Sequence, residues 1–148
     1  KVKFAILGCG HIGKRHAELV LQHPMGVEIS LQIAEYSPLH FNSLEDFLNA
    51  NIEVDVINIC TPNGLHAPQA IKCLEQGKHV VIEKPIALHN HDAQAILQAV
   101  QGSGKHVFPV MQNRYSSTVA WLKQIVSGGC LGEIYMVHLN CFWTRDER

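Results

Sequence analysis

Three glycines near the start of the chain have the spacing of a turn that binds a dinucleotide. Gly8-Cys9-Gly10-His11-Ile12-Gly13 fits the pattern G-x-G-x-x-G, between an apolar run at 2–7 and a helix-compatible stretch at 14–22. The first glycine allows the tight turn, the second lets the backbone approach a pyrophosphate, and the third lets the helix pack against the strand. The helix N-terminus adds N–H groups and a positive dipole end. We therefore predict a dinucleotide site here. Its contacts are Gly8, Gly10, His11, Ile12 and Gly13.

An ordinary strand–turn–helix corner is the alternative for this pattern. The alternating strands and helices that follow favour the dinucleotide interpretation.

Lys84 is the residue best suited to proton transfer. It follows the apolar run at 78–82, within Glu83-Lys84-Pro85, and the proline restrains it to an extended backbone. A lysine that is partly desolvated beside a cofactor can have a lowered pKa and exchange a proton with a substrate hydroxyl. A solvated loop lysine is the commoner case, but the end of a strand is where an α/β sheet binds its ligands. We expect Lys84 to be partly desolvated and catalytic.

Glu35 ends the apolar run at 27–34 and lies about 20 residues after the last glycine, where such sites place the acid that holds the ribose hydroxyls. No Arg or Lys lies between Arg15 and Lys72 to favour a 2′-phosphate. We therefore predict NAD rather than NADP as the cofactor. A solvated loop carboxylate is the alternative for Glu35.

The interval after Glu35 is short for a doubly wound unit, which needs a helix and a third strand there. Only 36–42 precedes a short helix that Ser43 and Asp46 cap in a capping-box-like pattern. Either an element is lost or a stretch of the chain is absent from the sequence.

Strands and helices alternate along the rest of the chain. The predicted strands are 54–60, 78–82 and 107–111, and the predicted helices are 65–76, 92–101 and 117–126. This alternation predicts a Rossmann-type, doubly wound parallel α/β sheet. The carboxyl edge of such a sheet would collect the glycine turn and three further motifs. These are Thr61-Pro62-Asn63, Glu83-Lys84-Pro85 and Gln112-Asn113-Arg114-Tyr115.

The pattern changes after residue 115. Residues 133–142 alternate as a long strand, and a single strand without a partner is not a finished element. We predict a dinucleotide-binding domain at 1–115, a linking helix and turn at 116–130, and the start of a second α/β domain at 131–148. The chain is then part of a longer protein.

Composition narrows the function classes. The chain has 148 residues, of which 47% are hydrophobic and 17% charged, with a net charge of -1. This suits a globular domain and gives no basic surface for nucleic acid or an anionic membrane. No apolar run reaches the ~18 residues of a membrane span, and no signal peptide is visible.

Cysteines and histidines indicate a protein without a metal. The five cysteines are odd in number and form no C-x-x-C, which favours free thiols in a reducing cytoplasm. The ten histidines show no cluster at metal-ligand spacing. His89 and His91 flank Asn90 near a helix start, where we expect a polar cap.

The motifs resemble, in their order, those of the Gfo/Idh/MocA oxidoreductases. The resemblance covers essentially the whole chain, and Glu83-Lys84-Pro85 is its distinctive part. Residues 112–114, 132–137 and 142–145 are most similar to the UDP-N-acetyl-2-amino-2-deoxyglucuronate 3-dehydrogenases of surface-polysaccharide synthesis. The resemblance implies a Rossmann domain followed by a substrate domain that also forms homo-oligomers. It implies NAD(P)-dependent hydride transfer between nicotinamide and a hydroxyl of a sugar, sugar nucleotide or cyclitol.

The resemblance also implies roles for single residues. Lys84 matches the lysine at the reacting hydroxyl. The implied cofactor contacts are Thr61, Pro62, Asn63, His66, Glu83, Lys84 and Gln112, and the implied substrate contacts are Lys84, Asn113 and Arg114. Structural roles are the alternatives: Asn63 as a helix cap, His66 packed in the first helical turn, and Arg114 as a surface cation. The family's Asp-x-x-x-His pair is expected beyond this chain, so we expect the chain alone to be inactive.

Two other function classes compete with the enzyme. One is a non-catalytic dinucleotide-binding sensor or regulatory subunit, which needs the glycine turn but has no chemical use for Lys84. The other is a structural α/β domain, which would have no affinity for nucleotides.

Overall fold

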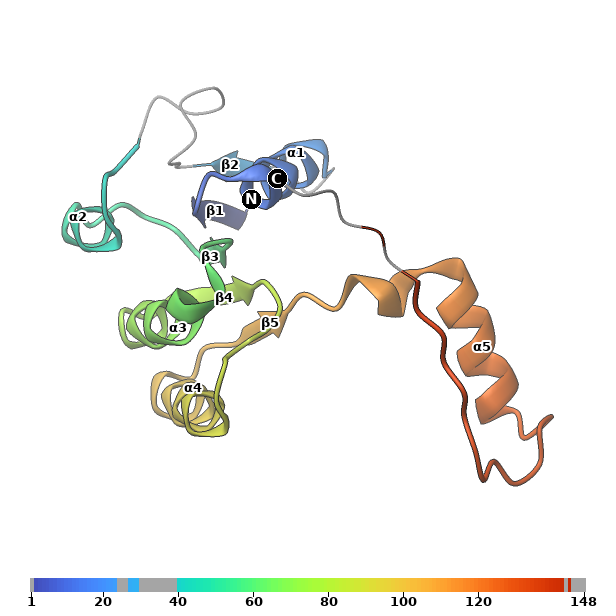
Figure 1. Cartoon of the computed structure of the whole chain (residues 1–148). Coiled ribbons are helices and arrows are strands. Elements are labelled where there is room, and N and C mark those ends of the chain that lie inside the picture. The colour runs from blue at the N-terminus through green and yellow to red at the C-terminus, as the bar shows by residue number, and fades with distance from the viewer. Residues whose placement is uncertain (1, 24–26, 30–39, 143, 145–148) are drawn as a thin grey trace. The chain divides into compact units, whose positions relative to one another are not determined.

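The computed structural model describes residues 2–23, 27–29, 40–142 and 144 (Figure 1). The chain divides into two compact units, Lys1–Val110 and Met111–Arg148. We describe each unit by itself. The described residues include no helix long and apolar enough to cross a membrane.

The first unit is built on a parallel sheet with the strand order β2-β1-β3-β4-β5. Its strands are β1 (Val2–Leu7), β2 (Val27–Ile29), β3 (Val56–Ile59), β4 (His79–Ile82) and β5 (Val107–Pro109). In the register, Leu7 pairs with Ile59 and Ile59 with Ile82. The carboxyl ends of β1, β3 and β4 are therefore level, and the residues that follow them share one edge of the sheet.

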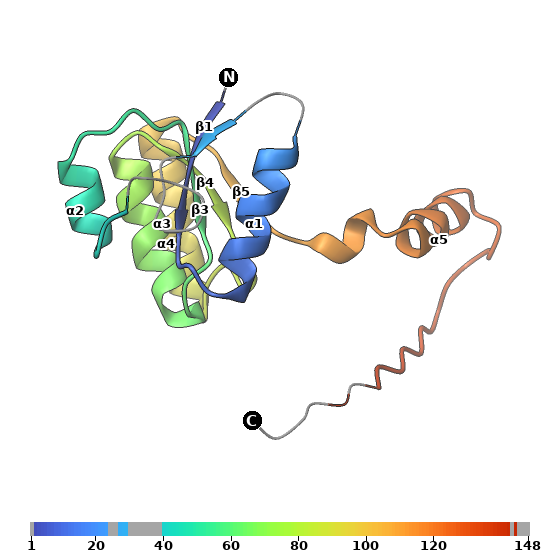
Figure 2. The same cartoon turned by 90° about the horizontal axis from the view of Figure 1, so that it is seen from above.

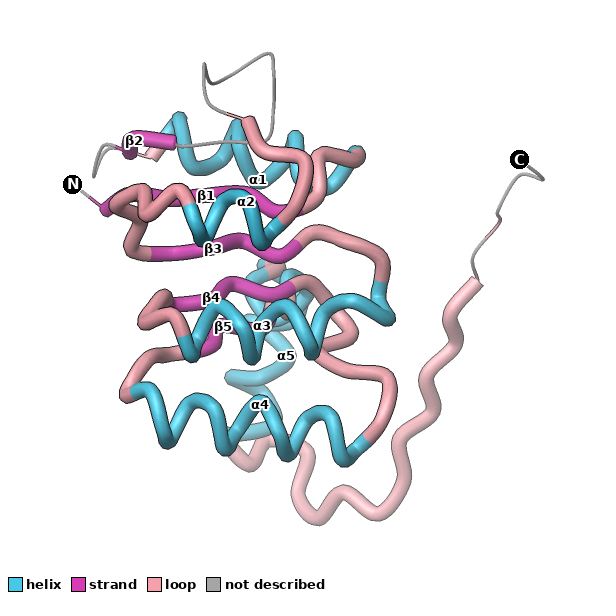
Figure 3. Tube along the Cα trace, turned by 90° about the vertical axis from the view of Figure 1, so that its left-hand side faces the viewer, coloured by secondary structure: helices cyan, strands magenta, loops and turns pink. Residues whose placement is uncertain are grey.

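Helices cover both faces of this sheet, as a doubly wound fold requires. They are α1 (His11–Gln22), α2 (Leu44–Asn49), α3 (His66–Glu75) and α4 (Asn90–Ser103), with a short 3-10 helix, η1 (Asn63–Leu65). Figure 2 and Figure 3 show α1 on one face and α2, α3 and α4 on the other. The predicted fold class is confirmed.

Alternation along the strands divides the core between the two faces. Ala5 and Leu7 of β1 belong to the larger cluster, which α2, α3 and α4 cover, whereas Ile6 packs with Ala17 of α1. The same alternation places Ile57 and Ile59 in the larger cluster. Asn58 lies between them, so its side chain is on the α1 face of the sheet. All four residues of β3 are buried, and Asn58 is the polar one among them.

The predicted helices are present, with ends shifted by a few residues. α1 begins at His11 rather than at residue 14. Ser43 caps α2 as predicted, because its side chain accepts a hydrogen bond from the Asp46 N–H at 3.0 Å. The expectation of a polar cap before α4 was wrong: His89 is the N-cap but makes no side-chain cap bond, and its ring stacks on that of His91 instead.

The short connection after β2 lies partly outside the described residues, and so does Glu35. Within residues 40–55, which the structure describes, α2 is the one helix or strand. The strand order is that of a Rossmann sheet without the outermost strand beside β2, as far as the described residues extend.

The second unit contains a 3-10 helix, η2 (Gln112–Tyr115), and α5 (Ser117–Ser127). The prediction of a strand at 133–142 was wrong, since these residues are described without helix or strand. A strand needs a hydrogen-bonded neighbour, and the described part of this unit offers no second strand. The unit boundary, between Val110 and Met111, lies close to the predicted limit at 115. The functional assignment of the domains stays a prediction.

Candidate functional site

Two glycines of the turn are required by backbone packing. Gly8 has a φ of +95°, and a Cβ there would lie 2.7 Å from the carbonyl carbon and oxygen of Cys60. A Cβ on Gly13 would lie 2.0 Å from the carbonyl oxygen of Gly8. The start of α1 thus packs directly on the turn, and the turn packs directly on the end of β3. This matches the roles that the sequence predicts for the first and third glycines.

Gly10 has open space around it instead. A Cβ there would meet no atom within 4 Å, although the residue is the N-cap of α1. No side-chain cap bond is made at this helix end, and its first turn holds no acidic residue. The first N–H groups of α1 and the positive end of its dipole therefore face an exposed backbone surface beside His11 and Ile12. These features fit a pyrophosphate, as the second glycine of the motif predicts.

Gly10→Ala separates binding from folding. We expect the variant to fold normally, because the added methyl group meets no protein atom. The dissociation constant for NADH should rise at least about tenfold, because the methyl group occupies the surface that a pyrophosphate approaches closely. Titration of the complete protein with NADH, followed by nicotinamide fluorescence, measures this.

Gly102→Ala is the matched control, because Gly102 also has no atom within 4 Å of an added Cβ. It lies in α4, away from the turn. Unchanged NADH affinity in Gly10→Ala would contradict the assignment of a pyrophosphate to this helix end.

A cleft of about 550 Å³ lies beside the turn. Gly8, Thr61, Leu65, Gln69 and Lys72 are among its lining residues. Its mostly apolar lining and its size suit the nucleoside part of a dinucleotide.

The fold brings Lys72 to this cleft, although the sequence separates it widely from the glycine turn. Its ammonium group forms an ion pair and hydrogen bond with the Glu45 carboxylate. The hydrogen bond from Lys72 holds the pKa of Glu45 below its ordinary value. The absence of a nearby Lys or Arg in the sequence was therefore a wrong ground for predicting NAD over NADP, because Lys72 lines the cleft. The prediction then depends on Glu35 and on the pairing of Lys72 with the Glu45 carboxylate.

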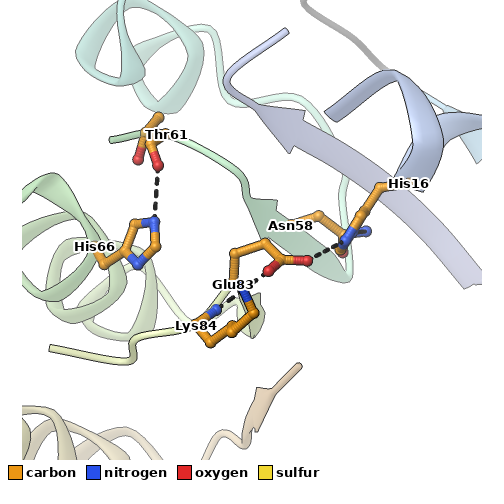
Figure 4. Close-up of polar contacts among 6 residues, drawn as sticks. All are labelled: His16, Asn58, Thr61, His66, Glu83 and Lys84. Atoms are coloured by element: carbon orange, nitrogen blue, oxygen red, sulfur yellow. Dashed lines mark hydrogen bonds and ion pairs between the residues drawn. The ribbon is translucent and has the colours of Figure 1, made fainter. Parts of the chain in front are cut away.

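His66 joins the loop after β3 to the loop after β4. The residue is 1% exposed, and its Nδ1 lies 2.7 Å from the carbonyl oxygen of Pro85. Its Nε2 lies 2.8 Å from the carbonyl oxygen of Thr61 (Figure 4). Because both ring nitrogens contact backbone carbonyls, the geometry supports the structural alternative for His66. The hydroxyl of Thr61 in turn donates to Oε1 of Gln69 at 2.6 Å.

The other residues predicted in this loop are at the surface. Pro62 and Asn63 are exposed, and Asn63 begins η1 without a side-chain cap bond at that end. Their contact with a cofactor stays a prediction.

Lys84 and Glu83 point different ways at the end of β4. Lys84 is exposed, so the first unit does not supply the partial desolvation that the sequence led us to expect. The reason is that the chain leaves the sheet directly after β4, which ends at Ile82. The Lys84–Pro85 peptide bond is cis. The Glu83 side chain is buried, and its Oε2 accepts a hydrogen bond from the Lys84 N–H at 3.2 Å.

Sequence reasoning missed two residues of this site, His16 and Asn58. Nε2 of His16 lies 3.0 Å from Oε1 of Glu83, and Nδ2 of Asn58 lies 3.1 Å from Nδ1 of His16 (Figure 4). A signal for Asn58 was available, since it is the one polar residue within the apolar run Val56–Ile59. A buried polar group needs a hydrogen-bond partner. A partner for Asn58 is to be expected on α1, because this helix covers the same face of the sheet.

The remaining predicted residues lie in the second unit. Gln112, Asn113 and Arg114 form most of η2, and all three are exposed. Their contacts with cofactor and substrate stay predictions.

The cysteines are free thiols, as predicted. Burial raises the pKa of the Cys60 thiol to about 12, with a smaller contribution from the Glu83 carboxylate, and burial raises that of Cys73 to about 12. Both thiols therefore stay protonated at neutral pH and do not act as nucleophiles. Within the described residues, no group of three His, Cys, Asp or Glu side chains could hold a metal ion.

The parallel sheet, the glycine turn at its edge and the uncapped start of α1 define a dinucleotide-binding domain of the Rossmann type. Residues 2–110 match the family GFO_IDH_MocA, described as an oxidoreductase family with an NAD-binding Rossmann fold. The chain belongs to this family, and the resemblance seen in the sequence motifs is confirmed.

The solved structures that resemble the chain include two enzymes bound to a cofactor and a nucleotide sugar. One is the WlbA dehydrogenase from Bordetella pertussis in complex with NADH and UDP-GlcNAcA, 36% identical, with a TM-score of 0.93 over 99% of this chain and 48% of that one. The WlbA dehydrogenase from Chromobacterium violaceum, with the same two ligands, is 34% identical, with a TM-score of 0.93 over 99% of this chain and 45% of that one.

A curated relative acts on a cyclitol. Inositol 2-dehydrogenase from Salmonella typhimurium is 29% identical over 93% of this chain and 45% of its own length. The chain thus spans about half the length of the relatives it matches.

Proposed function

We propose that this chain is the cofactor-binding part of an NAD-dependent dehydrogenase that oxidises a hydroxyl group of a UDP-sugar acid to a ketone, or catalyses the reverse reaction. The observation that carries the proposal is the position of Lys84. It is an exposed lysine at the carboxyl edge of the sheet, directly after β4, and this edge also holds the glycine turn. The WlbA complexes support the substrate class, because they match almost the whole chain at 34% and 36% identity.

Each part of the site then has a role in the reaction. The first N–H groups of α1 bind the pyrophosphate, and Gly10 leaves room for it. NAD, when bound there, would supply the hydride acceptor for the carbon that carries the hydroxyl. Lys84 takes up the hydroxyl proton at Nζ as general base in the oxidation and returns it in the reduction. Glu83 holds the Lys84 backbone through the bond to its N–H.

The remaining parts of the proposal concern the complete protein. The second unit begins the domain that holds the substrate, with Asn113 and Arg114 near it and Gln112 near the nicotinamide. Such a protein acts in the cytoplasm, assembles as a homo-oligomer and serves polysaccharide biosynthesis. The sequence resemblance supports the homo-oligomer and the biosynthetic role, the free thiols support the cytoplasm, and Glu35 remains the predicted ribose ligand.

Titrations of the complete protein with NADH and NADPH test the cofactor and come first. We expect NADH to bind at least about tenfold more tightly, since Glu35 is the predicted ribose ligand and Lys72, a cation at the cleft, is already paired with Glu45. Tighter binding of NADPH would contradict the roles of Glu35 and of this ion pair. Binding of neither nucleotide would leave a structural α/β domain.

A substrate comparison tests the reaction. With NAD present, UDP-GlcNAcA should give NADH, seen as absorbance at 340 nm, whereas UDP-GlcNAc and myo-inositol should give at least about tenfold lower kcat/KM. UDP-GlcNAc is the matched control, because it differs only in carrying a hydroxymethyl group in place of the carboxylate. Tight NADH binding with no turnover of any sugar or cyclitol would favour the sensor instead.

A further inference from the structure

Three polar side chains, two of them buried and one largely buried, connect the helix of the glycine turn to the loop that carries Lys84. They are Asn58 of β3, His16 of α1 and Glu83 after β4, and we call them the polar link. Asn58 and Glu83 are 3% and 8% exposed. The link lies on the α1 face of the sheet, where its neighbours Ile6, Ala17 and Cys60 form an apolar cluster.

The hydrogen bonds of the polar link converge on the Glu83 carboxylate. The Asn58 Nδ2 can only donate, so Nδ1 of His16 accepts, and the neutral ring then carries its proton on Nε2. Nε2 donates to Oε1 of Glu83, and Oε2 of the same carboxylate accepts from the Lys84 N–H. Three bonds thus join β3, α1 and the backbone of Lys84.

The cost of this arrangement is visible at Asn58. Its Oδ1 is buried and has no hydrogen-bond partner within the described part of the chain. An unpaired buried acceptor lowers stability, and an apolar side chain would suit the surrounding cluster better. Local costs of this kind are typical of residues that a site requires.

We propose that His16 and Asn58 are positioning residues for Lys84. They hold the Glu83 carboxylate so that the Lys84 backbone keeps a fixed place relative to the start of α1, where the pyrophosphate binds. Neither residue contacts substrate or cofactor in this role. The inference rests on the proposed function, because it assigns the link to the reaction of Lys84.

Two substitutions of His16 test the link as a matched pair. In His16→Gln the amide nitrogen takes the place of Nε2 and can still donate to Oε1 of Glu83. In His16→Asn the shorter side chain ends near the place of Nδ1 and leaves Oε1 of Glu83 without this bond. We expect His16→Gln to retain kcat within about threefold and His16→Asn to lose about tenfold to a hundredfold, because small misplacements of a reacting group are costly. The NADH dissociation constant should change less than about twofold in both.

Asn58→Leu provides a second test, which keeps the proposal falsifiable should His16→Asn fail to fold. The substitution removes the unpaired Oδ1 and also the donor that fixes the tautomer of His16. We expect the melting temperature to stay level or rise while kcat falls at least about fivefold. A merely structural residue would lower both together. Unchanged kcat in a folded Asn58→Leu would overturn the positioning role.

The outcomes separate this inference from the proposed function. Equal kcat in His16→Gln and His16→Asn, with turnover lost in Lys84→Ala, overturns the positioning role alone. Turnover retained in Lys84→Ala overturns the catalytic role of Lys84 and the inference with it.

Discussion

Lys84→Ala should reduce kcat by about a thousandfold in the complete protein and leave the NADH dissociation constant within about threefold. General acid–base catalysis by one positioned side chain contributes about 10²- to 10⁴-fold, and no other lysine follows a strand of the sheet at its carboxyl end in the described first unit. Binding should survive because the proposed pyrophosphate site consists of backbone groups at Gly10 and the first turn of α1. Stopped-flow or steady-state absorbance at 340 nm measures kcat.

The fold is not at risk in this variant, because Lys84 is exposed and contributes its backbone N–H, which alanine keeps. Lys78→Ala is the matched control. Lys78 precedes the same strand, β4, at the opposite edge of the sheet. Normal turnover in Lys84→Ala would contradict the catalytic role of Lys84 and would leave the glycine turn and the cleft as the proposed cofactor site.

Much of the first unit could be predicted from the sequence because a parallel sheet buries both faces of its strands. The runs at 54–60 and 78–82 are nearly continuous in apolar character, and both contain the observed strands, β3 and β4. The glycine turn could be assigned residue by residue, since each glycine answers a separate steric requirement. The added Cβ positions confirm those for Gly8 and Gly13, and open space at Gly10 agrees with its role.

The polar link and Lys72 could not be predicted because they depend on register and packing. Asn58 and Glu83 lie far apart in the sequence and meet through the common partner His16. The parallel register that pairs Asn58 with Val81 brings the ends of β3 and β4 together, and α1 supplies the histidine. Sequence spacing gives no measure of such contacts.

The predicted strand at 133–142 failed for a different physical reason. Alternation of apolar side chains shows which faces a strand would have but supplies no hydrogen-bonded neighbour. Tyr135, Val137, Leu139 and Phe142 are all at least 80% exposed in the second unit by itself. The pattern is thus compatible with a strand only where another chain segment covers it.

Among the described glycines, Gly13 is the one whose replacement by alanine should cause the largest loss of stability. The new Cβ would lie 2.0 Å from the carbonyl oxygen of Gly8, and neither backbone can yield without opening the turn or moving α1 off the sheet. Gly13 is already helical, so intrinsic propensity would favour alanine by about 1 kcal/mol. A loss of stability in Gly13→Ala would therefore come from the clash and not from helix propensity.

We expect Gly13→Ala to lose more than about 4 kcal/mol in the free energy of unfolding or to fail to fold, since effects of this size arise where the backbone cannot relax. Urea denaturation followed by far-UV circular dichroism measures the loss. Gly102→Ala is the helical control, with open space around the added Cβ, and should be neutral or stabilising. Near-normal stability in Gly13→Ala would show that α1 can move away from the turn. The close approach of α1 to the turn would then not be the feature that fixes the helix N-terminus at the proposed pyrophosphate site.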